Sequence, residues 1–161
     1  MKALKHTITF EKCDFESPEH LNALVELTNH YMADPMGGAT AHNKLQQLRL
    51  VDGLANHPTA EIYFAVEDCK AVGMATCFVN FSTFNIKPYL YIHDFVVHSA
   101  VRGKGISNAL LAYLIDLSTE RGYCKLTLEV RTDNKIAKSL YARMGFEACE
   151  PEMLFWTKKI V

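Results

Sequence analysis

The stretch from residue 92 to residue 107, Ile-His-Asp-Phe-Val-Val-His-Ser-Ala-Val-Arg-Gly-Lys-Gly-Ile-Ser, leads from an apolar strand through a basic turn into a helix. Gly103 and Gly105 allow the chain to bend so that successive N–H groups of residues 102–107, called the glycine turn below, point into one concavity. The unpaired N–H groups at the start of the following helix add donors, and two basic side chains add positive charge. The segment therefore predicts an anion site suited to a pyrophosphate.

Two common phosphate-binding loops do not fit this segment. A Walker loop that ends at Gly103-Lys104 needs glycine where His98 stands, and a dinucleotide fingerprint that begins at Gly103 needs glycine or alanine where Asn108 stands. A plain tight turn that ends a strand is the alternative interpretation, in which the basic side chains are only solvated.

The order of an apolar strand, Arg-Gly-Lys-Gly-Ile, a small residue and a Leu-Leu helix resembles the cofactor motif of the GNAT superfamily of N-acetyltransferases. The family's later signature follows one helix and one strand further on, as Asn134, Ala137, Leu140-Tyr141 and Gly145-Phe146. Ser107 departs from the family's preference for Gly or Ala. The resemblance spans residues 90–147 and implies an α/β (α+β) fold: a single-domain, GNAT-like acyl-CoA N-acyltransferase fold with a mixed, mostly antiparallel sheet flanked by helices.

The resemblance also implies how acetyl-CoA binds as co-substrate. Main-chain groups of three strand residues would pair with the pantetheine arm like an added strand, namely Phe95, Val96 and Val97. The pyrophosphate would lie on the glycine turn, at Arg102, Gly103, Lys104, Gly105, Ile106 and Ser107.

Two residues of the second signature each have two interpretations. Tyr141 is implied to protonate the departing thiolate, but its spacing also suits a core tyrosine on the half-buried face of the last helix. Asn134 is implied to contact the cofactor, but Asn is also a common helix N-cap, for which Asp133 competes.

The attacking amine must lose a proton, because a lysine-like amine has a pKa of about 10. Asp94 and His93 lie on the strand that leads to the glycine turn, and alternation places them on opposite faces, so at most one points into the cleft. The sequence does not decide between the two. Asp94 is taken as the candidate base, although it could instead bind a cationic substrate or cap a turn. The loop 34–38 is either one wall of the acceptor pocket or a plain connector.

Length and composition limit the range of functions. With 161 residues and 49% hydrophobic content, the chain suits a single domain, residues 1–161. A net charge of −1 with interspersed charges argues against nucleic acid or an anionic membrane as partner. The cysteines are scattered, and the N-terminal segment, residues 1–6, lacks an apolar run; both features favour a cytoplasmic protein. The histidines show no zinc-binding pattern, so we expect no metal.

Hydrophobic periodicity predicts helices at 18–32, 41–55, 105–121 and 134–144, and strands at 7–10, 62–66, 72–81, 89–97, 123–130 and 153–160. The strands from 62 onward read as a meander followed by one βαβ unit. A right-handed crossover makes the strands around residues 95 and 128 parallel. Edge strands at 72–81 and 153–160 would suit a homodimer.

The leading hypothesis is acetyl transfer from acetyl-CoA to a primary amine of a small molecule or peptide, by direct attack in a ternary complex. No cysteine is needed for an acyl intermediate. A non-catalytic acyl-CoA-binding sensor or regulatory module is one alternative, and a structural protein with an incidental glycine turn is another. Neither the acceptor nor the acyl chain length follows from the sequence.

Overall fold

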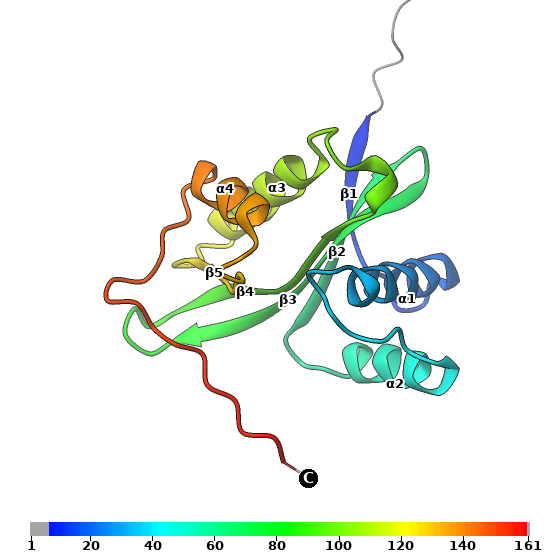
Figure 1. Ribbon diagram of the computed structural model, residues 1–161, viewed down its shortest axis with the longest axis horizontal. Helices are drawn as coiled ribbons and strands as arrows, with labels where there is room; N and C mark the ends of the chain where they lie inside the picture. The colour runs from blue at the N-terminus through cyan, green and yellow to red at the C-terminus, as the bar shows by residue number, and fades with distance from the viewer. Residues whose placement is uncertain (1–6, 161) are drawn as a thin grey trace, which may run out of the picture.

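The computed structural model describes residues 7–160 and has one sheet with helices on both of its faces (Figure 1). The strands follow the order β1-β2-β3-β4-β5, in which neighbours are antiparallel except for the parallel pair β4 and β5. The elements are β1 (Ile8–Lys12), α1 (Pro18–Ala33), α2 (Lys44–Ala55), β2 (Ala60–Glu67), β3 (Lys70–Ser82), β4 (Lys87–Val97), a short 3₁₀ turn (Ser99–Val101), α3 (Ile106–Glu120), β5 (Leu126–Leu128) and α4 (Lys135–Arg143). The predicted α+β fold, with a mixed and mostly antiparallel sheet flanked by helices, is confirmed.

Two apolar cores lie on opposite faces of the sheet. One packs beneath α3 and α4, and the other beneath α1 and α2. The central strands β2 and β3 contribute to both cores, which is why residues 62–65 and 72–77 are buried without interruption. Such strands read as continuous apolar runs, because neither face meets water.

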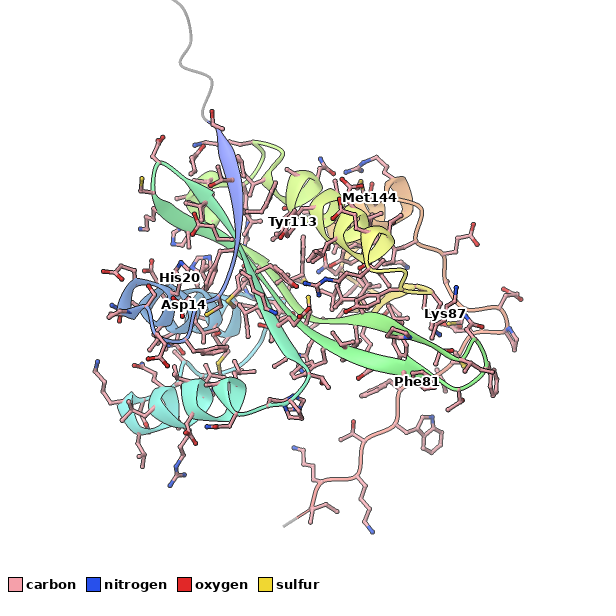
Figure 2. All side chains as sticks on the ribbon, turned by 180° about the vertical axis from the view of Figure 1, so that it is seen from behind. Asp14, His20, Phe81, Lys87, Tyr113 and Met144 are labelled. Carbon is pink, nitrogen blue, oxygen red and sulfur yellow. The ribbon has the colours of Figure 1, made fainter. Side chains whose placement is uncertain are left out.

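Polar caps fix where the first two helices begin. The N–H of His20 donates to Ser17 Oγ at 3.3 Å, and Pro18 occupies the first helical position, as the sequence predicted. In α2, Asn43 and Gln46 cap each other reciprocally, so the helix begins at Lys44 rather than at 41. Figure 2 shows Asp14 and His20 together at the entry to α1, where the Asp14 N–H donates to His20 Nδ1 at 2.9 Å.

Three strand predictions need correction. β5 is shorter than the predicted 123–130, because its pairing with β4 covers only Leu126–Leu128. β3 is an interior strand, so 72–81 is not an edge; the edges are β1 and β5. No strand forms at 153–160, where four consecutive apolar residues lack the alternation of a half-buried strand and find no neighbouring strand.

Two segments project from the body of the molecule. The hairpin between β3 and β4 extends beyond the sheet, with Phe81 and Lys87 near its tip (Figure 2). The C-terminal segment leaves α4 and runs past this hairpin (Figure 1). Its large apolar side chains are exposed, namely Met153, Leu154, Phe155, Trp156 and Ile160.

Within residues 7–160, none of the helices has the length and apolar character needed to cross a bilayer. In the same part of the chain, His, Cys, Asp and Glu side chains do not gather in threes around a point that could hold a metal ion. The segment 1–6, on which the expectation of no signal peptide depended, lies outside the described residues.

Candidate active site

The glycine turn joins the 3₁₀ turn after β4 to the first residue of α3. Gly103 and Gly105 have φ angles of 83° and 84°, a left-handed conformation that costs other residues about 1 to 2 kcal/mol. Gly105 is the N-cap of α3, and the next residue, Ile106, is buried in the core and fixes the helix start. A cavity of about 260 Å³ opens beside the turn, lined by Val97, Val101, Arg102, Gly103, Gly105, Ile106, Ser107, Asn108, Ile136, Leu140 and Arg143.

Both basic side chains of the glycine turn have acidic partners. Arg102 Nη2 lies 2.8 Å from Asp34 Oδ2 and its Nε donates to the Val97 carbonyl at 3.0 Å, so Arg102 ties the turn to α1 and β4. The Met36 N–H and Arg102 hold the pKa of Asp34 below its usual value. Lys104 Nζ lies 3.5 Å from a carboxylate oxygen of Glu67.

A third cation reaches the cavity from α4. Arg143 lines it together with Ile136 and Leu140 of the same helix, and its guanidinium donates to Ser139 Oγ at 2.7 Å. Nothing in the spacing of the sequence singles this residue out, because only the folded arrangement brings α4 to the cavity.

β4 and β5 separate next to this cavity. Their parallel pairing ends at Ile92, whereas β4 continues to Val97. The His98 N–H donates to the Val72 carbonyl on β3, and alternation along an antiparallel ladder then turns the main-chain groups of Phe95 and Val97 toward the gap. By the same alternation, the main chain of Val96 turns toward β3. Two of the three strand residues named from the sequence therefore face the gap.

A β-bulge in β4 changes the expected direction of one candidate base. Thr76 pairs with Asp94 and Cys77 pairs with Ile92, which leaves His93 as the extra residue. His93 and Asp94 consequently lie on the same face of the sheet, with His93 Nδ1 3.2 Å from Asp94 Oδ1. The expectation that they occupy opposite faces is wrong, because simple alternation fails across a bulge.

The His93–Asp94 pair forms one end of a second cavity, of about 170 Å³, between the sheet and the first two helices. It is lined by Thr28, Leu50, Leu54, Thr76, Phe78, His93 and Asp94. The hydrogen bond to Asp94 raises the pKa of His93 above 6.5, against the opposing effect of burial. The loop 34–38 does not contribute to the described lining, and its Asp34 holds Arg102 instead.

Tyr141 of α4 lies beside the gap. Its side chain is 9% exposed, and its ring packs edge-on against Phe95 with 6.3 Å between centroids. Burial, together with the nearby Tyr31, raises the pKa of Tyr141 to about 12, so the hydroxyl keeps its proton near neutrality. Among residues 7–160 this hydroxyl has no hydrogen-bond partner, which leaves it available to a ligand.

Tyr31 of α1 was not identified from the sequence. Burial first, and then the charges of Asp94 and Asp34, raise the pKa of Tyr31. Tyr31 therefore lies close enough to Asp94 for the two groups to interact electrostatically, and it also contributes to the raised pKa of Tyr141. Its position on a helix far away in the sequence gave no signal.

Asn134 caps α4, since its side chain accepts a hydrogen bond from the Ala137 N–H at 3.1 Å. Asp133 does not take the cap but pairs with Arg131 at 2.8 Å. Of the two interpretations of Asn134, the structure displays the N-cap, and Asn134 lines neither described cavity.

In sequence, the chain is similar to known and inferred acetyltransferases. The model of the acetyltransferase (GNAT) family matches residues 22–146. An uncharacterized N-acetyltransferase of Bacillus subtilis, YhfO, is 29% identical over 130 residues, covering 78% of this chain and 82% of that protein. The streptothricin acetyltransferase of Streptomyces lavendulae is 41% identical over 71 residues, covering 44% of this chain and 36% of that protein.

Solved structures share the fold. A possible acetyltransferase from Clostridium difficile 630 superposes with a TM-score of 0.80 at 16% identity, covering 96% of this chain and 98% of that one. An aminoglycoside N-acetyltransferase, AAC(6')-Iy, determined in complex with CoA, superposes with a TM-score of 0.77 at 16% identity, covering 99% of this chain and all of that one.

Proposed function

Because this chain belongs to the acetyltransferase (GNAT) family, we propose that it uses acetyl-CoA to acetylate a primary amine by direct attack in a ternary complex. The separation of β4 and β5 beside the glycine turn carries the proposal. It leaves extended main chain for a pantetheine arm at one end and N–H groups for a pyrophosphate at the other. The aminoglycoside acetyltransferase with the same fold was determined with CoA, which supports this choice of co-substrate.

In the proposed reaction the neutral amine attacks the carbonyl carbon of the acetyl thioester and forms a C–N bond. The C–S bond then breaks and its electron pair goes to sulfur. The proton lost by nitrogen passes to the Asp94–His93 pair, and the thiolate takes a proton from the Tyr141 hydroxyl, which solvent later restores. The products are an N-acetyl amide and the free thiol of CoA.

The arrangement of the residues suits these roles. Asp94 directly precedes Phe95, so the pocket on one face and the gap at the strand edge meet at this point of β4. A main-chain N–H in the gap is placed to polarise the thioester carbonyl. Holding both substrates in this geometry replaces a bimolecular collision with an intramolecular step.

The alternative of a non-catalytic acyl-CoA sensor or regulatory module has less support. A sensor needs no second cavity beside the thioester position and no protonated hydroxyl without a partner, yet the described residues provide both. A small-molecule or peptide amine therefore remains the proposed partner, with nucleic acid and membrane not expected. The name of one relative mentions streptothricin, and the name of one protein with the same fold mentions an aminoglycoside.

Calorimetric titration with acetyl-CoA tests the cofactor site. Gly105→Glu places a carboxylate where the pyrophosphate would lie, and we expect it to abolish binding. Gly122→Glu is the matched control, because Gly122 also has a positive φ, of 69°, and open space around it, but follows the other end of α3. Binding that survives Gly105→Glu as well as it survives the control would contradict the proposal.

A further inference from the structure

The cavity beside Asp94 has one apolar wall and one polar end. Leu50 and Leu54 of α2 face Phe78 of β3, while His93 and Asp94 close the end nearest the strand gap. The volume is about 170 Å³, and an apolar cavity of about 150 Å³ accommodates benzene. The space therefore suits one six-membered ring or a branched alkyl group of the same size.

The polar end of the cavity provides for a single charge. Within the described part of the chain, Asp94 is the one carboxylate in the lining, which includes no Lys or Arg. One of its oxygens is already engaged by His93 at 3.2 Å. A second ammonium group in the acceptor, or a carboxylate, would lie against the apolar wall without an opposite charge, and removing a charge from water without a partner is unfavourable.

The lining of the cavity contains no second carboxylate among the described residues. Thr28 and Thr76 contribute only hydroxyl groups. Glu129 lies outside the lining and is exposed, and it accepts a hydrogen bond from the Tyr91 hydroxyl at 2.9 Å. Its charge helps to raise the pKa of His93, but less than the hydrogen bond to Asp94 does. Tyr31 of α1 is near Asp94 but is neutral at ordinary pH.

We infer that the acceptor is an apolar primary monoamine, that is, one ammonium group attached to a single ring or branched alkyl group with no further charge. This inference rests on the proposed function and narrows it. It separates the chain from acetyltransferases named for aminoglycosides, which are polycations, although such proteins share its fold.

Four ring amines of nearly the same shape test this inference by thiol release from acetyl-CoA. They are benzylamine, 4-methylbenzylamine as the size control, 4-(aminomethyl)benzylamine with a second cation, and 4-(aminomethyl)benzoate with an anion. We expect kcat/KM for benzylamine and 4-methylbenzylamine, which carry no second charge, to exceed that of each of the other two compounds by at least tenfold. The value for the diamine is first divided by two, because it has two reactive amines. Spermidine should be used no better than the charged rings.

A change of charge inside the cavity provides the second test. Leu54→Asp adds a carboxylate to the apolar wall and should shift the preference toward the diamine by tenfold or more. Leu54→Asn should not, because Asn has the same shape as Asp but carries no charge. Leu50→Asp repeats the test from one turn earlier on α2 if Leu54→Asp does not fold, as judged by circular dichroism.

The possible results of these experiments distinguish a failure of the inference about the acceptor from a failure of the proposed function. A preference for the diamine or spermidine over benzylamine, or an unchanged preference in both Asp variants, would overturn the inference. If acetyl-CoA binds but none of the monoamines is acetylated, the acceptor class is wrong while the proposed cofactor site stands. If acetyl-CoA does not bind at all, the proposed function fails and the inference fails with it.

Discussion

His93 and Asp94 occupy adjacent positions on β4 and still face one pocket. The residue types could be recognised from the sequence as candidates for proton transfer, but their common direction could not, because it depends on the register between β3 and β4. Tyr141 was recognisable from its motif, whereas Tyr31 and Arg143 were not, since long-range packing alone brings them to the site. At the scale of single residues, the sequence therefore indicates which side chains could take part in catalysis, but not which way they point.

Tyr141→Phe should lower kcat by about 10²-fold, within the range expected for general acid catalysis, and leave the Kd of acetyl-CoA unchanged. The raised pKa of Tyr141, about 12, also predicts that kcat of the wild type shows no loss from Tyr141 ionisation up to pH 10. Steady-state kinetics and calorimetry check both points. Tyr113→Phe on α3, where the ring stacks on Phe10, is the control. Full turnover by Tyr141→Phe would remove this role.

The His93–Asp94 pair should also affect stability in a pH-dependent way. Asp94 raises the pKa of His93 above 6.5, so the pair's contribution is complete below pH 6.5 and is lost as pH rises through the folded-state pKa. His93→Gln should therefore lower the free energy of unfolding more at pH 5.5 than at pH 9. Denaturant titrations of the single variants, Asp94→Asn and the double variant give the coupling at each pH. A coupling that grows with pH would contradict the assignment.

Among the elements, the helices and the central strands were the most predictable. Their periodicity and caps are local signals, such as Ser17-Pro18 at the start of α1 and the glycines around α3. The bulge in β4 and the early end of β5 were not predictable, because both depend on pairing with other strands. These two irregularities create the gap and direct the candidate base, so the part of the fold hidden from the sequence is the part nearest the proposed chemistry.

Deleting His93 should restore a regular ladder between β3 and β4. A bulge bends its strand and increases the local twist, so its removal should let β5 follow β4 further and narrow the gap. We expect the deletion to weaken acetyl-CoA binding at least tenfold while the protein stays folded. His93→Ala keeps the extra residue and should keep the affinity. Equal affinities of the two variants for acetyl-CoA, measured by calorimetry, would show that the bulge is not needed for cofactor binding.

At the scale of the whole molecule, the C-terminal segment was predicted incorrectly and remains exposed. Its apolar side chains are exposed, as are Phe84 and Ile86 of the β3–β4 hairpin. Both segments project from the body of the molecule (Figure 1). Exposed apolar patches commonly mark interfaces between proteins. The homodimer expected from the sequence thus stays a prediction, but its basis moves from the edge strands to these two projections.

Replacing Phe155 and Trp156 together with serine should reduce self-association. Light scattering after size exclusion should give a dimer mass for the wild type and a monomer mass for this variant, because the burial of two large aromatic rings is lost. Replacing Lys158 and Lys159 with serine changes the same segment without removing apolar surface, and should leave the mass unchanged. A monomeric wild type at high concentration would refute the prediction.

A crystal structure with acetyl-CoA bound tests the central claim most directly. We predict hydrogen bonds from the pantetheine arm to main-chain groups of Phe95 and Val97 but not Val96, the pyrophosphate on the N–H groups of the glycine turn, and the thioester sulfur within reach of the Tyr141 hydroxyl. Acetyl-CoA bound elsewhere, or a complex in which the gap between β4 and β5 stays empty, would contradict the account.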